Sequence, residues 1–148
     1  MVKLYAYAGK TLRVNLTSGS FKTIPLDPSA ARQFLGGRGF NSCNIYRELP
    51  PGIDPLGPRN KVYLSTGPLV GTMFPTASRF NISAKSPQTG ILGDSNAGGH
   101  LAAEMKYAGY DQVILEGRSP DPVYIFVDDD KVSLRDASNL KGKDTYET

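Results

Sequence analysis

The sequence is poor in the residues that build disulfides and metal centres. Its 148 residues include one cysteine, one histidine and no tryptophan. The single cysteine, Cys43, excludes an internal disulfide framework, and no cysteines or histidines stand at metal-ligand spacing. A protein-ligated metal or iron–sulfur cluster therefore cannot be built from these residues alone.

Long apolar runs and basic runs are also missing. No hydrophobic stretch approaches the roughly 18–20 residues of a membrane span, and residues 1–5 lack the apolar stretch of a signal peptide. Lysines and arginines are scattered among acids, and the formal net charge is only +3, so nucleic-acid binding gains no support. We expect a cytoplasmic protein with neither a membrane nor a nucleic acid as partner.

Turn-forming residues, by contrast, are abundant: 16 glycines and 11 prolines. The length suits one domain with its own hydrophobic core. Alternating patterns predict hairpins over residues 11–24 and 123–134, and their similarity hints at a weak internal duplication. Helices inserted among mostly antiparallel strands indicate an α+β fold.

Other elements are expected between the two hairpins. Asp27 and Pro28 supply the N-cap and first-turn proline of a helix that runs to about Leu35. Gly36-Gly37-Arg38-Gly39 lacks the spacing of a dinucleotide fingerprint, and we interpret it as a helix C-cap and turn. The remaining expected elements are a helix over residues 40–49 and strands over residues 61–66, 78–85 and 112–116.

The strand expected over residues 78–85 has two faces of different character. The apolar positions expected to enter the core are Phe80, Ile82 and Ala84. The polar positions expected to line the opposite face are Arg79, Asn81, Ser83 and Lys85. Arg79 is either a surface arginine whose stem covers apolar area or a bidentate donor to a phosphate.

The segment from Gly93 to His100 places small residues and one amide directly before a helix. Glycine and alanine leave peptide N–H groups uncovered, and a helix start adds further N–H groups and a positive dipole end, so the segment predicts an anion-binding turn. The helix is expected over residues 101–108, with Gly109 ending it. The simpler alternative is a structural turn with Asn96 as the N-cap of that helix.

The remaining candidate groups have ordinary explanations. Asp128-Asp129-Asp130 favours a solvated hairpin turn over a cation site. His100 is either a proton donor in a pocket or a surface side chain at a helix start. The charges expected on helix surfaces or strand ends are Glu104, Lys106, Asp111 and Glu116.

Six short segments occur in one order along the chain: Gly36-Gly37-Arg38-Gly39, Thr66-Gly67-Pro68-Leu69, Ser78-Arg79, Lys85-Ser86-Pro87, Ser95-Asn96-Ala97-Gly98-Gly99 and Lys106-Tyr107-Ala108-Gly109-Tyr110-Asp111. Together they resemble the N-terminal domain of tungsten-dependent aldehyde ferredoxin oxidoreductases. Each segment is weak alone, but six in register are specific. With weaker matches near both ends, the resemblance covers essentially the whole chain.

The resemblance implies a base domain of two β-sheets that supports tungsten, or molybdenum, held by two pterin dithiolenes. It implies that Arg79 contacts a pterin phosphate and that Ala97 and Gly98 contact the cofactor. The main-chain carbonyl of Asn96 would help hold a magnesium ion that bridges the two phosphates. No catalytic residue is expected in this chain.

The implied reaction oxidises an aldehyde to its carboxylic acid and passes electrons through a [4Fe-4S] cluster to ferredoxin. The cluster cysteines and the second pterin-binding half belong to later sequence in the family. We therefore expect residues 1–148 to be an incomplete domain that continues beyond Thr148, partners with further domains and is inactive alone. Asp144 would be the N-cap of a further helix. The resemblance leaves a homodimer open.

Two alternatives remain. The chain could be a stand-alone phosphate-binding, cofactor-binding or scaffold domain without redox activity. Alternatively, since His100 replaces the apolar residue usual in the family, the protein could act on another substrate, including those of the branch that reduces aromatic rings.

Overall fold

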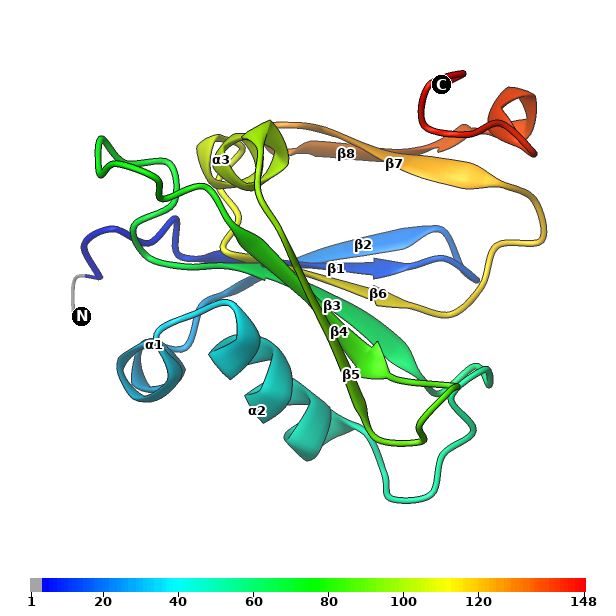
Figure 1. Ribbon diagram of the computed structural model, residues 1–148, viewed down its shortest axis with the longest axis horizontal. Coiled ribbons are helices and arrows are strands. Elements are labelled where there is room, and N and C mark those ends of the chain that lie inside the picture. Colours follow the sequence, from blue (N-terminus) through cyan, green and yellow to red (C-terminus); the bar gives the residue numbers. More distant parts are fainter. Residues whose placement is uncertain (1–3) are drawn as a thin grey trace.

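A mixed β-sheet forms the centre of the molecule in the computed structural model, which describes residues 4–148 (Figure 1). Met1 to Lys3, part of the start in which we expect no signal peptide, lie outside this range. The strand order is β2-β1-β6-β3-β4-β5. These strands are β1 (Lys10–Asn15), β2 (Ser20–Pro25), β3 (Lys61–Thr66), β4 (Phe80–Lys85), β5 (Leu92–Ala97) and β6 (Gln112–Glu116).

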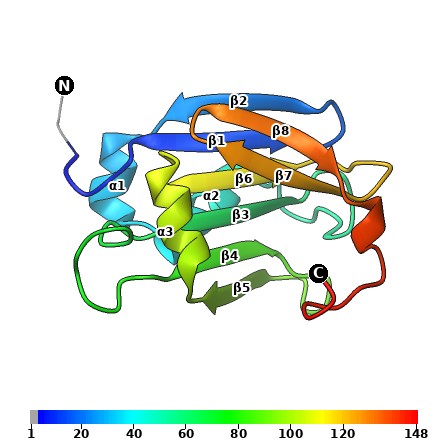
Figure 2. The same ribbon diagram turned by 90° about the horizontal axis from the view of Figure 1, so that it is seen from above.

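Helices cover both faces of this sheet. Helices α1 (Pro28–Phe34) and α2 (Arg38–Glu48) lie on one face, and α3 (His100–Tyr107) lies on the other beside a second sheet (Figures 1 and 2). That sheet is the hairpin of β7 (Val123–Asp128) and β8 (Lys131–Asp136). Within residues 4–148, β1 and β6 form the only parallel pair, so the predicted α+β fold with largely antiparallel sheets is confirmed. The internal duplication stays a prediction.

Two glycines bring the start of α2 against the end of β3. Helix α1 has the predicted Asp27 N-cap, whose carboxylate accepts from the Ser29 N–H at 2.8 Å, and ends at Leu35. Gly37, the N-cap of α2, donates its N–H to the Thr66 carbonyl at 2.9 Å. A Cβ on Gly36 would stand only 2.5 Å from that carbonyl oxygen, so this approach requires glycine.

The end of α3 follows its sequence signal. Gly109 has a φ of 95°, its N–H donates to the Lys106 carbonyl at 3.0 Å, and the Tyr110 N–H donates to the Met105 carbonyl at 3.0 Å. This pair of bonds is a Schellman motif, in which a left-handed glycine ends the helix. The predicted helix stop at Gly109 is confirmed, although the helix itself lies one residue earlier than expected.

The chain ends in a capped turn. The N–H groups of Tyr146 and Glu147 donate to the Asp144 carboxylate at 2.8 and 3.0 Å, and the Asp144 N–H donates to Glu147 at 3.1 Å. These reciprocal bonds are a capping box. Asp144 therefore has the N-cap geometry that the sequence predicts.

The predicted polar face of β4 is not open to solvent. Asn81 and Ser83 are only 2% and 1% exposed, because α2 packs over that face of β3 and β4. On the other face, Phe80 forms a small core cluster with Val70 and Ala102. The apolar and polar side chains of β4 thus lie on opposite faces, as predicted, and both faces are covered because helices lie on both sides of the sheet.

Candidate functional site

An open cleft of about 370 Å³ lies where the start of α2, the loop after β3, the start of β4 and the end of β5 meet. In Figure 2 the loop that joins β3 to β4 and the end of β5 lie at the same end of the sheet. Four of the six sequence segments contribute to its lining, through Gly36 and Gly37, Gly67 to Leu69, Ser78 and Arg79, and Asn96. Segments far apart in the sequence thus meet at one place.

Arg79 is the one charged residue among those that line the cleft. It is exposed, directly precedes β4, and makes no hydrogen bond or ion pair with the part of the chain that the structure describes. Its neighbour Ser78 donates a hydrogen bond to the Gly99 carbonyl, which brings this segment beside the glycines before α3. The guanidinium is therefore available to an anion in the cleft.

Asn96 and Ala97 lie in an edge strand, where the sequence predicts a turn. They pair with Asn81 and Phe80 of β4, so only Gly98 and Gly99 separate β5 from α3. The expectation of an anion-binding turn from Gly93 onward was wrong in this respect, because the ladder with β4 continues to Ala97. An edge strand presents main-chain groups that pair with no neighbouring strand.

The alternative in which Asn96 caps α3 is also wrong. Gly99 is the N-cap, with a φ of 108°, and no side chain bonds to the helix start there. The Asn96 side-chain oxygen instead accepts a hydrogen bond from the Asn81 amide at 3.3 Å. The first N–H groups of α3 therefore lack a side-chain acceptor.

A buried amide network links this cleft to α2. Asn41, fully buried in α2, donates to the side-chain oxygen of Asn81 at 2.8 Å and to the carbonyl of Tyr63 at 3.0 Å. Asn81 in turn donates to the Asp94 carboxylate at 2.6 Å and to the Ser95 carbonyl at 3.0 Å. The network fixes β5 to the helix, and the sequence analysis did not anticipate it. Its one sequence signal is a pair of asparagines in α2, at positions 41 and 44, on the sheet side.

Asp94 carries a second link, to the first residue of α2. Its Oδ2 lies 2.5 Å from the guanidinium of Arg38. Burial opposes ionisation of the carboxyl, but hydrogen bonds from Asn81, Arg38 and Ser83 outweigh it, so the pKa of Asp94 lies below its usual value. Asp94 is therefore charged at neutral pH.

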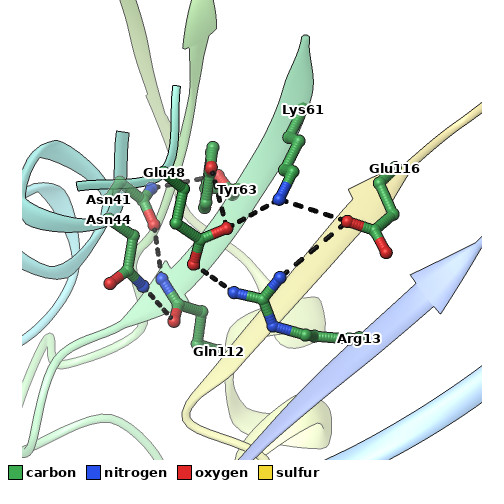
Figure 3. Close-up of polar contacts among 8 residues, drawn as sticks. All are labelled: Arg13, Asn41, Asn44, Glu48, Lys61, Tyr63, Gln112 and Glu116. Carbon is green, nitrogen blue, oxygen red and sulfur yellow. Dashed lines mark hydrogen bonds and ion pairs between the residues drawn. The ribbon is translucent and has the colours of Figure 1, made fainter. Parts of the chain in front are cut away.

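A different charged cluster occupies the far end of β3 (Figure 3). Glu48 accepts from Lys61 at 2.8 Å and from Arg13, and Lys61 also lies 3.2 Å from Glu116. Burial and the nearby charge of Glu48 raise the pKa of Tyr63, whose hydroxyl donates to Glu48 at 3.5 Å. Two cations and two carboxylates satisfy one another, so this cluster, which we call the ion-pair cluster, is structural.

The charges expected on surfaces divide into two groups. Glu104 is exposed, as predicted, and Glu116 belongs to the ion-pair cluster. Asp111 lies at a strand end, directly before β6, but Lys106 is not on the helix surface: the two form a 2.5 Å ion pair with side chains only 7% (Lys106) and 1% (Asp111) exposed. Asp111 also accepts from the Gly9 N–H at 2.6 Å, so the segment before β1 covers the pair.

His100 is exposed at the first position of α3 and is not among the residues that line the cleft. The Asp129-Asp130 turn joins β7 to β8 as predicted, and Asp130 pairs with Lys10 at 2.7 Å. Among residues 4–148, no group of three or more histidine, cysteine or acidic side chains could hold a metal ion. No helix in the same range has the length and hydrophobicity of a membrane span.

Residues 11–148 match the family described as the N-terminal domain of aldehyde ferredoxin oxidoreductase. The chain belongs to this family. The resemblance drawn from the six segments is thereby confirmed.

Relatives within the aldehyde ferredoxin oxidoreductase family agree with this assignment. A tungsten-containing aldehyde ferredoxin oxidoreductase from Thermococcus kodakarensis is 46% identical over 145 residues, which are 98% of this chain and 24% of the relative. The WOR-like subunit of an aliphatic sulfonate oxidoreductase from Pyrococcus furiosus is 37% identical over 142 residues, which are 94% of this chain and 22% of that subunit. The chain thus spans about a quarter of the length of these oxidoreductases.

A solved structure shows the same fold. The active-site complex BamBC of benzoyl coenzyme A reductase, in complex with 1,5 dienoyl-CoA, matches with a TM-score of 0.94 and 42% sequence identity. The match covers 97% of this chain and 22% of the chain in that complex. The N-terminal fold of aldehyde ferredoxin oxidoreductases therefore also occurs in a protein named for another substrate.

Proposed function

We propose that residues 1–148 form the N-terminal, cofactor-binding part of a tungsten bis-pterin oxidoreductase, incomplete without further domains of the same protein. The observation that carries the proposal is the cleft, where four of the six family segments meet around an arginine that has no partner in residues 4–148. The relatives named as tungsten-containing enzymes support it.

The donors at the cleft suit a phosphate-bearing cofactor. The forked guanidinium of Arg79 matches phosphate oxygens. Ala97 and Gly98 do not line the cleft themselves but directly follow Asn96, which does, and their small size would let an anion approach the main chain there. A Cβ on Gly98 would find its nearest neighbour, the Ser78 carbonyl oxygen, at 3.7 Å, so this stretch is uncrowded. The carbonyl of Asn96, in an edge strand, would be the magnesium ligand.

This chain would bind and orient the cofactor and would contribute no catalytic residue. When bound, tungsten or molybdenum between two pterins supplies two-electron redox chemistry. Residues outside 1–148 would ligate the [4Fe-4S] cluster, because this sequence has a single cysteine, Cys43, and such a cluster needs four cysteine ligands. By analogy with the named relatives, the substrate would be an aldehyde and the electron acceptor ferredoxin.

A second candidate function is reduction of an aromatic ring carried by coenzyme A. The benzoyl coenzyme A reductase complex favours it, since its identity of 42% is comparable to that of the aldehyde oxidoreductases. The cofactor-binding role of this chain would be the same in both cases.

Metal and pterin analysis of the native protein tests the proposal. In protein isolated from a tungstate-supplied native host, we expect Arg79→Ala to lower tungsten and pterin content while leaving the thermal stability of the cofactor-free form unchanged. Arg118→Ala is the matched control, because Arg118 is an exposed arginine just after β6, whose last residue, Glu116, pairs with Lys61 at the end of the sheet opposite the cleft. Full pterin content in the Arg79 variant, or wild-type protein that contains neither tungsten, molybdenum nor pterin, would contradict the proposal.

A further inference from the structure

A second arginine lies beside the cleft without lining it. Arg38 directly follows Gly37, which does line the cleft, and 63% of its side chain is exposed. Its guanidinium lies 2.5 Å from Asp94, two residues before Asn96 on β5. Side chains two apart on a strand share a face, so Arg38 lies on the same side of β5 as the Asn96 amide.

The Asn81 amide shows how close these groups are. Its nitrogen donates both to Asp94 Oδ1, at 2.6 Å, and to Asn96 Oδ1, at 3.3 Å. A single donor atom therefore joins the carboxylate that holds Arg38 to the residue proposed to hold magnesium.

Asp94 can release Arg38 without being left unpaired. Its Oδ1 also accepts from the Ser83 hydroxyl at 3.1 Å, in addition to the Asn81 amide. The Arg38 contact is to the other oxygen, Oδ2, and the arginine is largely exposed. An ion pair this exposed contributes little to folding stability, so an anion can compete for the arginine.

The charge of the expected ligand calls for such a second arginine. Two phosphate monoesters carry about −3 to −4 at neutral pH. A magnesium ion and Arg79 together supply +3, and Arg79 is the one charged residue that lines the cleft. A further cation beside the cleft would complete the neutralisation.

We propose that Arg38 is a second anion-binding arginine of this site, held by Asp94 until a phosphate group competes for it. The inference rests on the proposed function, since it assumes a phosphate ligand in the cleft. It differs from a purely structural role, in which Arg38 and Asp94 only fasten α2 to β5. The two roles predict different effects of removing the Asp94 carboxylate on anion affinity: an increase if Arg38 binds the anion, and no increase if the pair is only structural.

The test is a titration of this 148-residue chain with inorganic pyrophosphate and magnesium at low ionic strength, followed by NMR of backbone amides and arginine side chains. We expect Arg38→Gln to weaken pyrophosphate binding by about tenfold, the value of one charge-assisted hydrogen bond. Asp94→Asn should strengthen binding by about threefold, because Arg38 is freed. The double variant should lose that gain.

Matched variants separate the possible outcomes. Arg118→Gln, which changes an exposed arginine at the Lys61 end of the sheet, should bind like the wild type. Arg38→Lys, which keeps the charge, should fall between wild type and Arg38→Gln. If Asp94→Asn weakens binding, or if the double variant binds as tightly as Asp94→Asn, the inference fails. If Arg79→Gln weakens pyrophosphate binding and Arg38→Gln does not, the inference about Arg38 fails while the proposed function stands. A wild-type chain that does not bind pyrophosphate in the cleft overturns the proposed function as well.

Discussion

The charged side chains at the two ends of β3 differ in how they are paired. At the Lys61 end, Arg13, Lys61, Glu48 and Glu116 pair with one another at the sheet surface. At the Thr66 end, Arg79 has no partner within residues 4–148, and Arg38, whose side chain is 63% exposed, has a single partner, Asp94. The partners of these three arginines distinguish a structural ion-pair cluster from groups that are available to a ligand.

Between these ends lies the Asn41 network, and the largest effect is expected there. Asn41→Ala would leave Asn81, Ser65 and Gln112 without a partner they now bond, inside a layer covered by α2. We expect the free energy of unfolding to fall by about 2–4 kcal/mol, because buried polar groups lose their hydrogen bonds. Urea denaturation measures this loss. An unchanged urea midpoint would contradict a stabilising role for the Asn41 network.

The ion-pair cluster should respond next. Glu48→Gln leaves Arg13 and Lys61 to share Glu116. Because these side chains are partly buried, we expect a loss of about 1–3 kcal/mol in the free energy of unfolding, between the values for exposed and buried pairs. Glu104→Gln, at an exposed position of α3, is the control and should change little.

The pH dependence of the stability difference between wild type and Glu48→Gln tests whether the charge of Glu48 is responsible for it. Burial opposes ionisation of Glu48, but hydrogen bonds from Lys61 and Arg13 outweigh it and lower its pKa below the usual 4.5. A lowered pKa gives stability that is present above 4.5 and is lost as the pH falls through the folded-state value. The gap between wild type and Glu48→Gln should therefore close in acid. A constant gap would mean that the charge of Glu48 is not what stabilises the cluster.

The raised pKa of Tyr63 should make folding stability fall at alkaline pH, whereas Glu48 makes it fall in acid. Burial first, and then the charge of Glu48, raise its pKa above the usual 10.0, so the folded state favours the neutral phenol. Stability should fall as the pH rises beyond 10.0, where the unfolded chain releases the phenol proton. Tyr63→Phe should lose less stability between neutral pH and alkaline pH than wild type does. Equal losses would contradict this account of the cluster.

Arg79 should give the smallest effect on folding. Because it has no partner within residues 4–148, Arg79→Gln should change the free energy of unfolding by less than about 0.5 kcal/mol, as for most surface substitutions. Thermal denaturation without ligand measures it. A loss as large as that of Glu48→Gln would erase the contrast between the two ends.

Local signals in the sequence predicted two helix ends, the start of α1 and the end of α3. Asp27 and Gly109 act within one turn of their own backbone, so their roles could be read from the neighbouring residues. The matched segments also assigned Arg79 and Asn96 to one site, and both line one cleft in the structure. From the sequence, Gly36-Gly37 was interpreted only as a cap and turn, yet these glycines line the same cleft.

The features that the sequence analysis did not predict depend on contacts with residues far away along the chain. Gly93 to Asn96 has low strand propensity, and β5 forms there because β4 provides the ladder. The Lys106–Asp111 pair is buried by a segment about a hundred residues earlier in the chain, at Ala8 and Gly9. The sequence places the polar residues of β4 on one face, but nothing local reveals that α2 covers that face.

The central claim is that the phosphate-binding groups lie at the Thr66 end of β3. Chemical-shift mapping of the chain with magnesium and pyrophosphate tests it most directly, because both ends carry arginines that could attract the anion. The account predicts the largest shifts at Arg79, Ala97, Gly98 and Gly99, with little change at Arg13 and Lys61. Shifts centred on Arg13 and Lys61, or spread evenly over both ends, would contradict it.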